Sequence, residues 1–165
     1  MNQEPRTQNP ERRTKNQEQK PMAFTPFIQR CRKTAHRETA SIGVQQLLLP
    51  WGMPRKTYVL HEFYCDDLSC DCRVARLVVL LGELGNGLET DAVLTVGWEP
   101  VAFYCREGLP FPALHGSMLA PDQPQGPWAW ALAAIVGVIY ADPDRLVELA
   151  AHYKEFRSTL LKEKN

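Results

Sequence analysis

The sequence has no excess of charge of either sign, because 19 lysine and arginine residues balance 19 aspartate and glutamate residues. A neutral chain has no overall field that draws it to nucleic acid or to an anionic membrane. Long hydrophobic runs are also missing, since the longest, at residues 127–141, is short of the roughly 20 residues that a membrane-spanning helix needs. The opening residues MNQEP contain no apolar stretch typical of a signal peptide. The sequence therefore predicts a soluble, cytoplasmic protein.

The common motifs of catalysis are missing as well. Ser117 lies in the run HGSM, which lacks the Gly-x-Ser-x-Gly frame of a hydrolase nucleophile. The glycine-rich run GELGNG at residues 82–87 precedes no helical pattern, so it does not predict a phosphate-binding loop. The sequence contains no recognisable catalytic constellation, and it leaves open whether the protein is an enzyme.

The composition divides the chain into three parts. Residues 1–22 are almost wholly polar and have little apolar surface to bury, so they are predicted to form a disordered tail. Residues 23–55 carry scattered apolar side chains and predict a partly ordered segment with a short helix over 27–38. The run PWGMP at 50–54 is typical of a boundary. Residues 56–165 are then predicted to form the folded domain.

The folded part has the pattern of a sheet. Residues 57–64, 74–81 and 92–99 are rich in β-branched, aromatic and aliphatic side chains, which predicts three strands. The segment 101–105 is a candidate fourth strand, and the five prolines within 108–127 predict an irregular crossover.

Two helices are predicted to follow the strands. Residues 128–140 are apolar on all sides, which is typical of a buried helix, although their glycine and β-branched residues leave a strand possible. Asp142-Pro143-Asp144 is a helix start, with an N-cap aspartate and a proline in the first turn. We therefore predict an α+β fold, an antiparallel meander of three or four strands with two C-terminal helices packed on one face.

The chain has five cysteines, and three of them lie within eight residues of sequence in the run YCDDLSCDCRV. Cys65, Cys70 and Cys72 fall between the first two predicted strands, at the tip of a hairpin. Three thiolates at such spacing can converge on one ion, and zinc in structural sites takes four ligands drawn from Cys and His. The neighbouring aspartates would repel the thiolates, and a divalent cation, helped by Arg73 and Arg76, would offset that repulsion.

The fourth ligand must come from elsewhere in the chain. His61 is four residues before Cys65, which in a regular strand separates their backbones by about 13 Å, so it is suitable only if the strand bulges. Cys105 is the first candidate and His152 the second. A water molecule in the fourth position would make the site catalytic rather than structural.

Other interpretations of the cysteines stay open. They can be free thiols in a tight turn, or Cys65 can form a regulatory disulfide with Cys70 or Cys72. An iron–sulfur cluster requires four such ligands. Zn²⁺ is the cofactor that the pattern favours.

The cysteine core, YC-x4-CDCR, resembles that of a family of small uncharacterised prokaryotic proteins. In that family a Gly-Trp-Glu strand and a C-terminal helix with a His-Tyr pair follow the core, and this chain has Gly97-Trp98-Glu99 and His152-Tyr153 in the same order. The resemblance covers residues 56–160, and only the cysteine core is specific. Those proteins often have Arg-Arg after the core, whereas Val74 follows Arg73 here. The resemblance implies a metal-binding domain and no established activity.

Two functions are compatible with these features. The first is a metal-binding module without enzymatic activity that interacts with a protein or a nucleic acid, through a basic N-terminal segment that includes Arg30–Arg37. The second is a metal- or thiol-dependent enzyme, with the cysteines in an open site and His152 or Glu62 as acid or base. The oligomeric state and the partner are not evident from the sequence.

Overall fold

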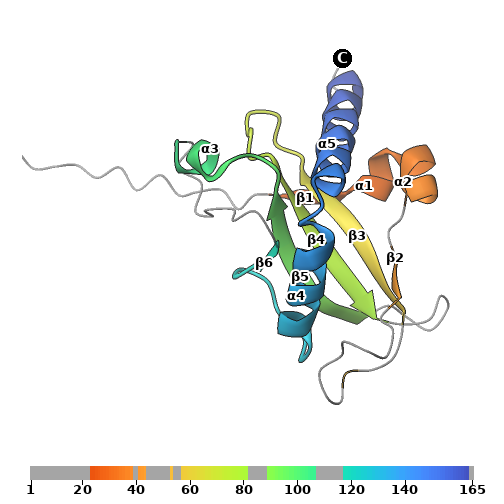
Figure 1. Cartoon of the computed structure of the whole chain (residues 1–165). Helices are drawn as coiled ribbons and strands as arrows, with labels where there is room; N and C mark the ends of the chain where they lie inside the picture. The colour runs from red at the N-terminus through yellow and green to blue at the C-terminus, as the bar shows by residue number, and fades with distance from the viewer. Residues whose placement is uncertain are drawn as a thin grey trace, which may run out of the picture.

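Figure 1 shows the computed structural model, which describes residues 23–38, 41–43, 53, 57–81, 89–106 and 117–163. The predicted disordered tail at 1–22 and the glycine-rich run at 82–87 lie outside the described residues. The described part forms one antiparallel sheet with helices after the strands, which confirms the predicted α+β class. No helix in that part is both long and apolar enough to cross a membrane.

The sheet has the strand order β1-β3-β4-β5-β6. On the outer edge of β3, β1 pairs with the C-terminal part of the strand and β2 with its N-terminal part. Every pairing is antiparallel, and β3, β4 and β5 form the meander that the hydrophobic pattern predicts. Branched and aromatic side chains favour the extended backbone of these strands because they pack well on a pleated surface. The strands are β1 (Phe24–Pro26), β2 (Ser41–Gly43), β3 (Thr57–Cys65), β4 (Val74–Leu81), β5 (Glu89–Gly97) and β6 (Ser117–Leu119).

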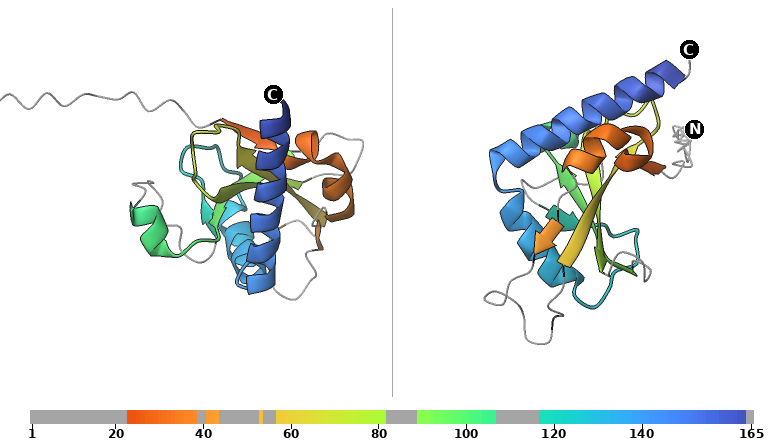
Figure 2. Two further views of the ribbon diagram at one scale, coloured as in Figure 1. Left: turned by 90° about the horizontal axis from the view of Figure 1, so that it is seen from above. Right: turned by 90° about the vertical axis from the view of Figure 1, so that its right-hand side faces the viewer.

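The helices α4 (Ala129–Ile139) and α5 (Pro143–Glu163) lie against the same face of this sheet (Figures 1 and 2). Alternate side chains of β3, including Tyr58, Leu60 and Tyr64, are buried there with the inner sides of the helices. The ring of Tyr64 contacts the rings of Phe156 at 5.6 Å and of Phe27 at 5.7 Å between centroids. The core therefore joins the sheet, α5 and the N-terminal segment.

The start of α5 confirms the capping prediction. The Asp144 backbone N–H donates to Asp142 Oδ1 at 3.0 Å, and Pro143 occupies the first helical position. A side-chain acceptor here satisfies one of the amide groups that have no partner inside the helix. Because the cap fixes where the helix begins, it also sets which residues of α5 face the sheet.

The N-terminal segment closes the outer edge of β3. β1 pairs with residues 63–65 and β2 with 57–59, and between them the chain forms α1 (Phe27–Arg30) and α2 (Arg32–Glu38). The predicted helix over 27–38 is thus present, with a break at Cys31. Residues 60–62 of β3 lie between the two pairings.

Two predictions of local structure are wrong. Residues 101–105 do not form a fourth strand but belong to the short helix α3 (Val101–Arg106), which begins directly after Pro100. A helix turns Tyr104 back into the protein, where its side chain is fully buried. The proline-rich crossover includes a strand, β6, because residues 117–119 pair with β5. In both places a tertiary contact outweighs the local pattern.

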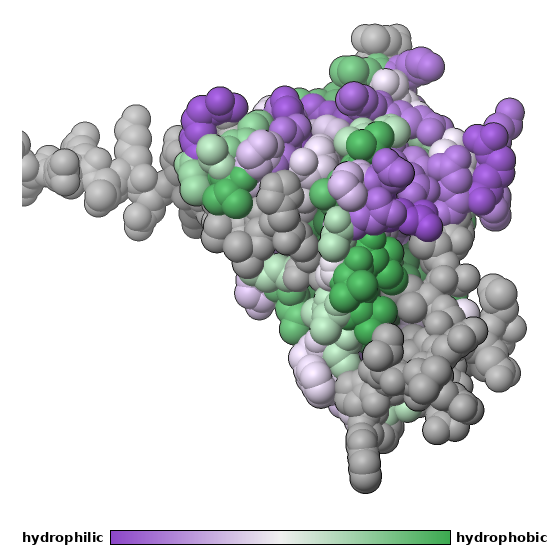
Figure 3. Space-filling view, viewed as in Figure 1, coloured by the Kyte–Doolittle hydropathy of each residue, from purple (hydrophilic) through white to green (hydrophobic). Residues whose placement is uncertain are grey.

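The helix α4 is not buried on all sides, contrary to the prediction from its apolar sequence. Trp130, Ala134 and Val138 recur at every fourth position, and all three are exposed; the exposed fraction is 60% for Trp130 and 77% for Val138. Figure 3 shows a hydrophobic patch over α4 and the start of α5, below the hydrophilic surface of α5, α1 and α2. Only the side that carries Leu132 and Val136 packs into the core.

Candidate metal centre

The cysteine loop, residues 66–73, connects β3 to β4, as predicted. Cys65 is the last residue of β3, and Cys72 precedes the start of β4 by two residues. Asp67 organises the turn between them, because its Oδ1 accepts hydrogen bonds from the Ser69 backbone N–H at 2.9 Å and from the Ser69 hydroxyl at 2.6 Å. The Cys70 N–H also donates to the Asp67 carbonyl at 3.1 Å. An aspartate side chain that accepts from the backbone two residues on is a common turn-forming contact.

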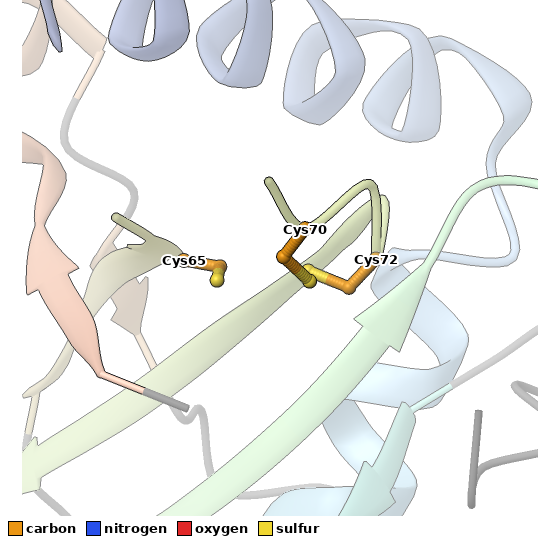
Figure 4. A group of neighbouring side chains, drawn as sticks. All are labelled: Cys65, Cys70 and Cys72. Atoms are coloured by element: carbon orange, nitrogen blue, oxygen red, sulfur yellow. The ribbon is translucent and has the colours of Figure 1, made fainter. Parts of the chain in front are cut away.

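The turn brings the three sulfurs together. The Sγ atoms of Cys65, Cys70 and Cys72 all lie within 4.8 Å of one another, and none of the three is in a disulfide. Figure 4 shows the side chains of Cys70 and Cys72 meeting at their sulfurs, with Cys65 directed toward them from the end of β3. Cys65 and Cys72 are buried, while Cys70 is half-buried. A metal ion would therefore reach the site from the side of Cys70.

Nearby backbone N–H groups favour the thiolate form of each of the three cysteines. The donors are Asp67 for Cys65, Cys72 for Cys70 and Val74 for Cys72, and each contact favours the thiolate. Hydrogen bonds to the charged form of a group stabilise that form. Hydrogen bonds to coordinating sulfurs also tune metal–thiolate sites. The backbone of the loop thus favours thiolates at all three positions, while burial opposes them.

The thiols differ in acidity when no metal is bound. The neighbouring Cys72 thiol, against the effect of burial, lowers the pKa of Cys65 to about 6. Contact with Cys65, together with burial, raises the pKa of Cys72, and burial raises the pKa of Cys70. Cys65 is therefore the most acidic of the three thiols when no metal is bound. A divalent ion would displace the thiol protons, because metal ligands are deprotonated.

Other elements hold the loop from both sides. Arg157 of α5 donates to the carbonyl oxygens of Asp67 at 2.6 Å and Leu68 at 2.8 Å. Thr25 of β1 donates its hydroxyl to Asp66 Oδ2 at 3.0 Å, and the Asp66 N–H donates to the Ala23 carbonyl at 3.2 Å. The cysteine loop is therefore attached both to α5 and to the N-terminal strand.

The end of the loop has an unusual backbone conformation. Arg73 has a φ of 48°, in the left-handed region that costs a residue other than glycine roughly 1–2 kcal/mol. The buried Tyr104 offsets this cost, because its hydroxyl donates to the Arg73 carbonyl at 2.9 Å and accepts from the Glu99 N–H at 3.0 Å. Arg73 also forms ion pairs with Asp71 at 2.8 Å and Glu99 at 2.9 Å. The turn after Cys72 is thus fixed by α3.

The aspartates of the loop do not depend on a cation for compensation. Asp66 is bonded to Thr25, Asp67 to Ser69, and Asp71 to Arg73, which lowers the pKa of Asp71. The other predicted helper, Arg76, pairs instead with Asp122 at 2.6 Å. The case for a metal ion therefore rests on the sulfur geometry rather than on aspartate repulsion.

The structure does not bring the two candidate fourth ligands to the sulfurs. Cys105 is exposed on α3, and His152 lies on α5 in a different cluster. Among the described residues, the cysteine group contains no fourth His, Cys, Asp or Glu ligand atom. These residues therefore supply three ligands and leave one coordination position to be filled.

His152 is buried among carboxylates. Its Nδ1 lies 2.8 Å from Glu62 Oε2, and its Nε2 contacts Glu38. Burial alone would lower the pKa of His152, but the hydrogen bonds and charges of the two glutamates raise it to about 9. The sequence analysis named His152 and Glu62 but missed Glu38 and Glu148. The spacing of Glu148 and His152, one helical turn apart on α5, was the signal available for Glu148.

Comparison of the chain with models of known families, with curated proteins and with solved structures finds no match. The resemblance of the cysteine core to a prokaryotic family therefore stays a prediction. The chemistry of the two clusters is the basis for a functional conclusion.

Proposed function

We propose that the protein is a small metal-binding module in which Cys65, Cys70 and Cys72 hold one Zn²⁺ ion in a structural role. The observation that carries this proposal is that the three sulfurs lie within 4.8 Å of one another, with no disulfide between them. A disulfide would use only two of the sulfurs, whereas one metal ion can use all three. Soft thiolate ligands favour zinc over magnesium or calcium.

A structural role is supported by the attachments of the loop. Arg157 joins it to α5, and Tyr104 joins it to α3, so an ion at the sulfurs would fasten two helices to the β3–β4 hairpin. The metal-binding energy then adds to the stability of this end of the sheet, because the unfolded chain does not hold the same ligand set. The proposal places the protein in a reducing compartment such as the cytoplasm, where thiols persist.

The ligand count favours a second candidate function. With three cysteine ligands, a zinc ion keeps one position for water, and zinc lowers the pKa of bound water to about 7. A metal- or thiol-dependent enzyme is therefore the alternative. Its acid or base would not be Glu62 or His152, since Glu62 and Cys65 are three residues apart in β3 and side chains alternate between the faces of a strand.

The proposal also includes a binding partner, which would contact α2. The basic residues Arg32, Lys33, His36 and Arg37 are all exposed on this helix. We propose that they contact an acidic partner, a nucleic acid or an acidic protein surface. Binding to duplex DNA and to single-stranded RNA is measured from low to high salt, with and without the Lys33→Gln and Arg37→Gln substitutions. Affinity that falls with salt and with the substitutions supports phosphate contacts, and a flat response argues against them.

The metal is tested by elemental analysis of the purified full chain, with thiols counted before and after chelation. We expect one zinc per chain and three thiols that become reactive only after the metal is removed. The structural function would be contradicted if the purified chain contained no metal and all three loop cysteines reacted with the thiol reagent before chelation. A bound metal with a titratable water ligand would favour the enzyme.

A further inference from the structure

A second group of ligand atoms lies between α2, α5 and β3. Glu38, Glu148 and His152 each place one ligand atom within 4.8 Å of the others. We call these three residues, together with Glu62, the His152 cluster. His152 is only 4% exposed, whereas the side chains of Glu38 and Glu148 are 37% and 32% exposed. The cluster therefore has a buried nitrogen and two carboxylates that solvent can reach.

Glu62 sets the direction of the imidazole. Its Oε2 accepts a hydrogen bond from the Tyr64 hydroxyl at 2.8 Å and lies 2.8 Å from His152 Nδ1. The Tyr64 hydroxyl also lies 3.2 Å from the Leu149 carbonyl, on the same helix as His152. With Nδ1 held by Glu62, the Nε2 atom is turned toward Glu38. A histidine that ligates a metal usually has its other ring nitrogen held by a carboxylate in this way.

The His152 side chain is further fixed by packing. The ring of Phe27 is stacked on the imidazole, with centroids 4.6 Å apart and planes 19° apart. A cavity of about 30 Å³ adjoins the ring, and its lining includes Phe27, Ala35, Glu38, Leu60, Glu62 and His152. That volume is enough for one or two water molecules beside an ion.

We propose that Glu38, Glu148 and His152 form a second cation site, which binds a divalent transition-metal ion through one nitrogen and two carboxylates. Imidazole and carboxylate ligands suit Mn²⁺, Fe²⁺ and Zn²⁺. Glu62 acts as a positioning residue, and waters in the cavity complete the coordination. Arg145 now pairs with Glu148 at 2.9 Å, so ion binding exchanges this exposed ion pair for a metal ligand.

The second site is chemically separate from the cysteine cluster. It contains no sulfur, and its strand residue, Glu62, lies on the face of β3 that carries Leu60 and Tyr64. Thiolates bind Mn²⁺ poorly compared with zinc, so the two sites can be filled with different metals. The inference therefore does not rest on the proposed zinc function, and either can fail alone.

The test uses the full chain, stripped of metal with a chelator and then loaded with one equivalent of Zn²⁺. Mn²⁺ is titrated in, and free Mn²⁺ is followed by its electron paramagnetic resonance signal. We expect one bound Mn²⁺ per chain. Glu148→Gln and Glu38→Gln should each weaken binding at least about tenfold, and Glu62→Gln, which keeps the size but not the charge, by about 10–100-fold.

Glu155→Gln is the matched control. Glu155 is an exposed acid on the same helix that also contacts α2, through Thr34 at 2.9 Å, but it is outside the cluster. It should bind Mn²⁺ as the unchanged protein does. Circular dichroism shows whether each variant is folded. Absence of Mn²⁺ binding in the unchanged protein, or equal binding in Glu148→Gln and Glu155→Gln, would overturn the proposal.

Discussion

Arg157 Nη2, near the middle of α5, donates a hydrogen bond of 2.8 Å to the backbone carbonyl of Leu68 in the cysteine loop. Its Nη1 donates to the neighbouring carbonyl of Asp67. One guanidinium thus holds two consecutive peptide groups between Cys65 and Cys70. The contact links a residue of the last helix to a loop far earlier in the sequence, and it gives α5 a direct effect on the sulfur geometry.

Replacing this arginine should loosen the loop without unfolding the protein. Hydrogen bonds from a charged donor contribute about 1.5–3 kcal/mol, so Arg157→Gln should lower the free energy of unfolding of the zinc-loaded protein by an amount in that range. Zinc should also transfer faster to a chromogenic chelator. Lys154→Gln, at an exposed position of the same helix, removes the same charge and should change neither quantity. Equal transfer rates for the two variants would refute the role of Arg157.

The hydroxyl of Tyr104, which makes two hydrogen bonds, should contribute more to stability than the weakly bonded hydroxyl of Tyr153. Tyr104→Phe leaves the Arg73 carbonyl and the Glu99 N–H without their shared partner, and an unsatisfied buried polar group costs about 1–3 kcal/mol. Tyr153→Phe is the control, since the Tyr153 hydroxyl makes only a 3.5 Å contact with Asp71. Urea denaturation should show the larger loss for Tyr104→Phe. The reverse order would show that α3 does not support the loop.

Only the cysteines of the cluster should affect the metal content. Cys72→Ser removes a buried ligand and should reduce zinc to well below one equivalent per chain. Cys105→Ser changes an exposed residue outside the cluster and should keep the full equivalent. Elemental analysis after extensive dialysis measures both. If Cys105→Ser lost the metal while Cys72→Ser kept it, the fourth-ligand prediction from the sequence would be favoured over the structure.

The pair formed by Arg76 and Asp122 predicts a small acid-sensitive contribution. Burial would raise the pKa of Asp122, but the hydrogen bond and charge of Arg76 lower it below its usual value. A depressed pKa stabilises the fold above about pH 3.8, the usual value, and the contribution is lost as the pH falls through the folded-state pKa.

Because the Asp122 side chain is 52% exposed, screening limits its contribution to about 1 kcal/mol. Asp122→Asn should therefore lower stability by that amount at neutral pH. The two proteins should become equally stable in strong acid. Chemical denaturation across pH measures the difference, and a gap that persists at pH 2 would contradict the assigned ion pair.

Local patterns were sufficient to predict the elements that local chemistry controls. The β-branched and aromatic side chains of residues 57–64 predicted β3, and Asp142 with Pro143 predicted the start of α5. The short spacing of the three cysteines was enough to predict that they meet in one hairpin loop.

Features that depend on distant contacts were missed. Tyr104 favours a strand by its side chain, but its hydrogen bonds to Arg73 and Glu99 require the turn of α3. Glu38 joins His152 across most of the chain, and no pattern in the sequence relates them. The exposure of Trp130, Ala134 and Val138 on α4 was missed. A helix sequence that is apolar on all sides does not indicate which side the sheet covers.

The most direct test of the central claim, one metal ion held by the three cysteines of the loop, is zinc K-edge X-ray absorption on the full chain with one equivalent of zinc. The account predicts three sulfur scatterers at about 2.3 Å and one lighter atom at about 2.0 Å. Cys70→Ser should reduce the sulfur count to two. A spectrum with only nitrogen and oxygen neighbours, or one unchanged by Cys70→Ser, would contradict the cysteine metal centre.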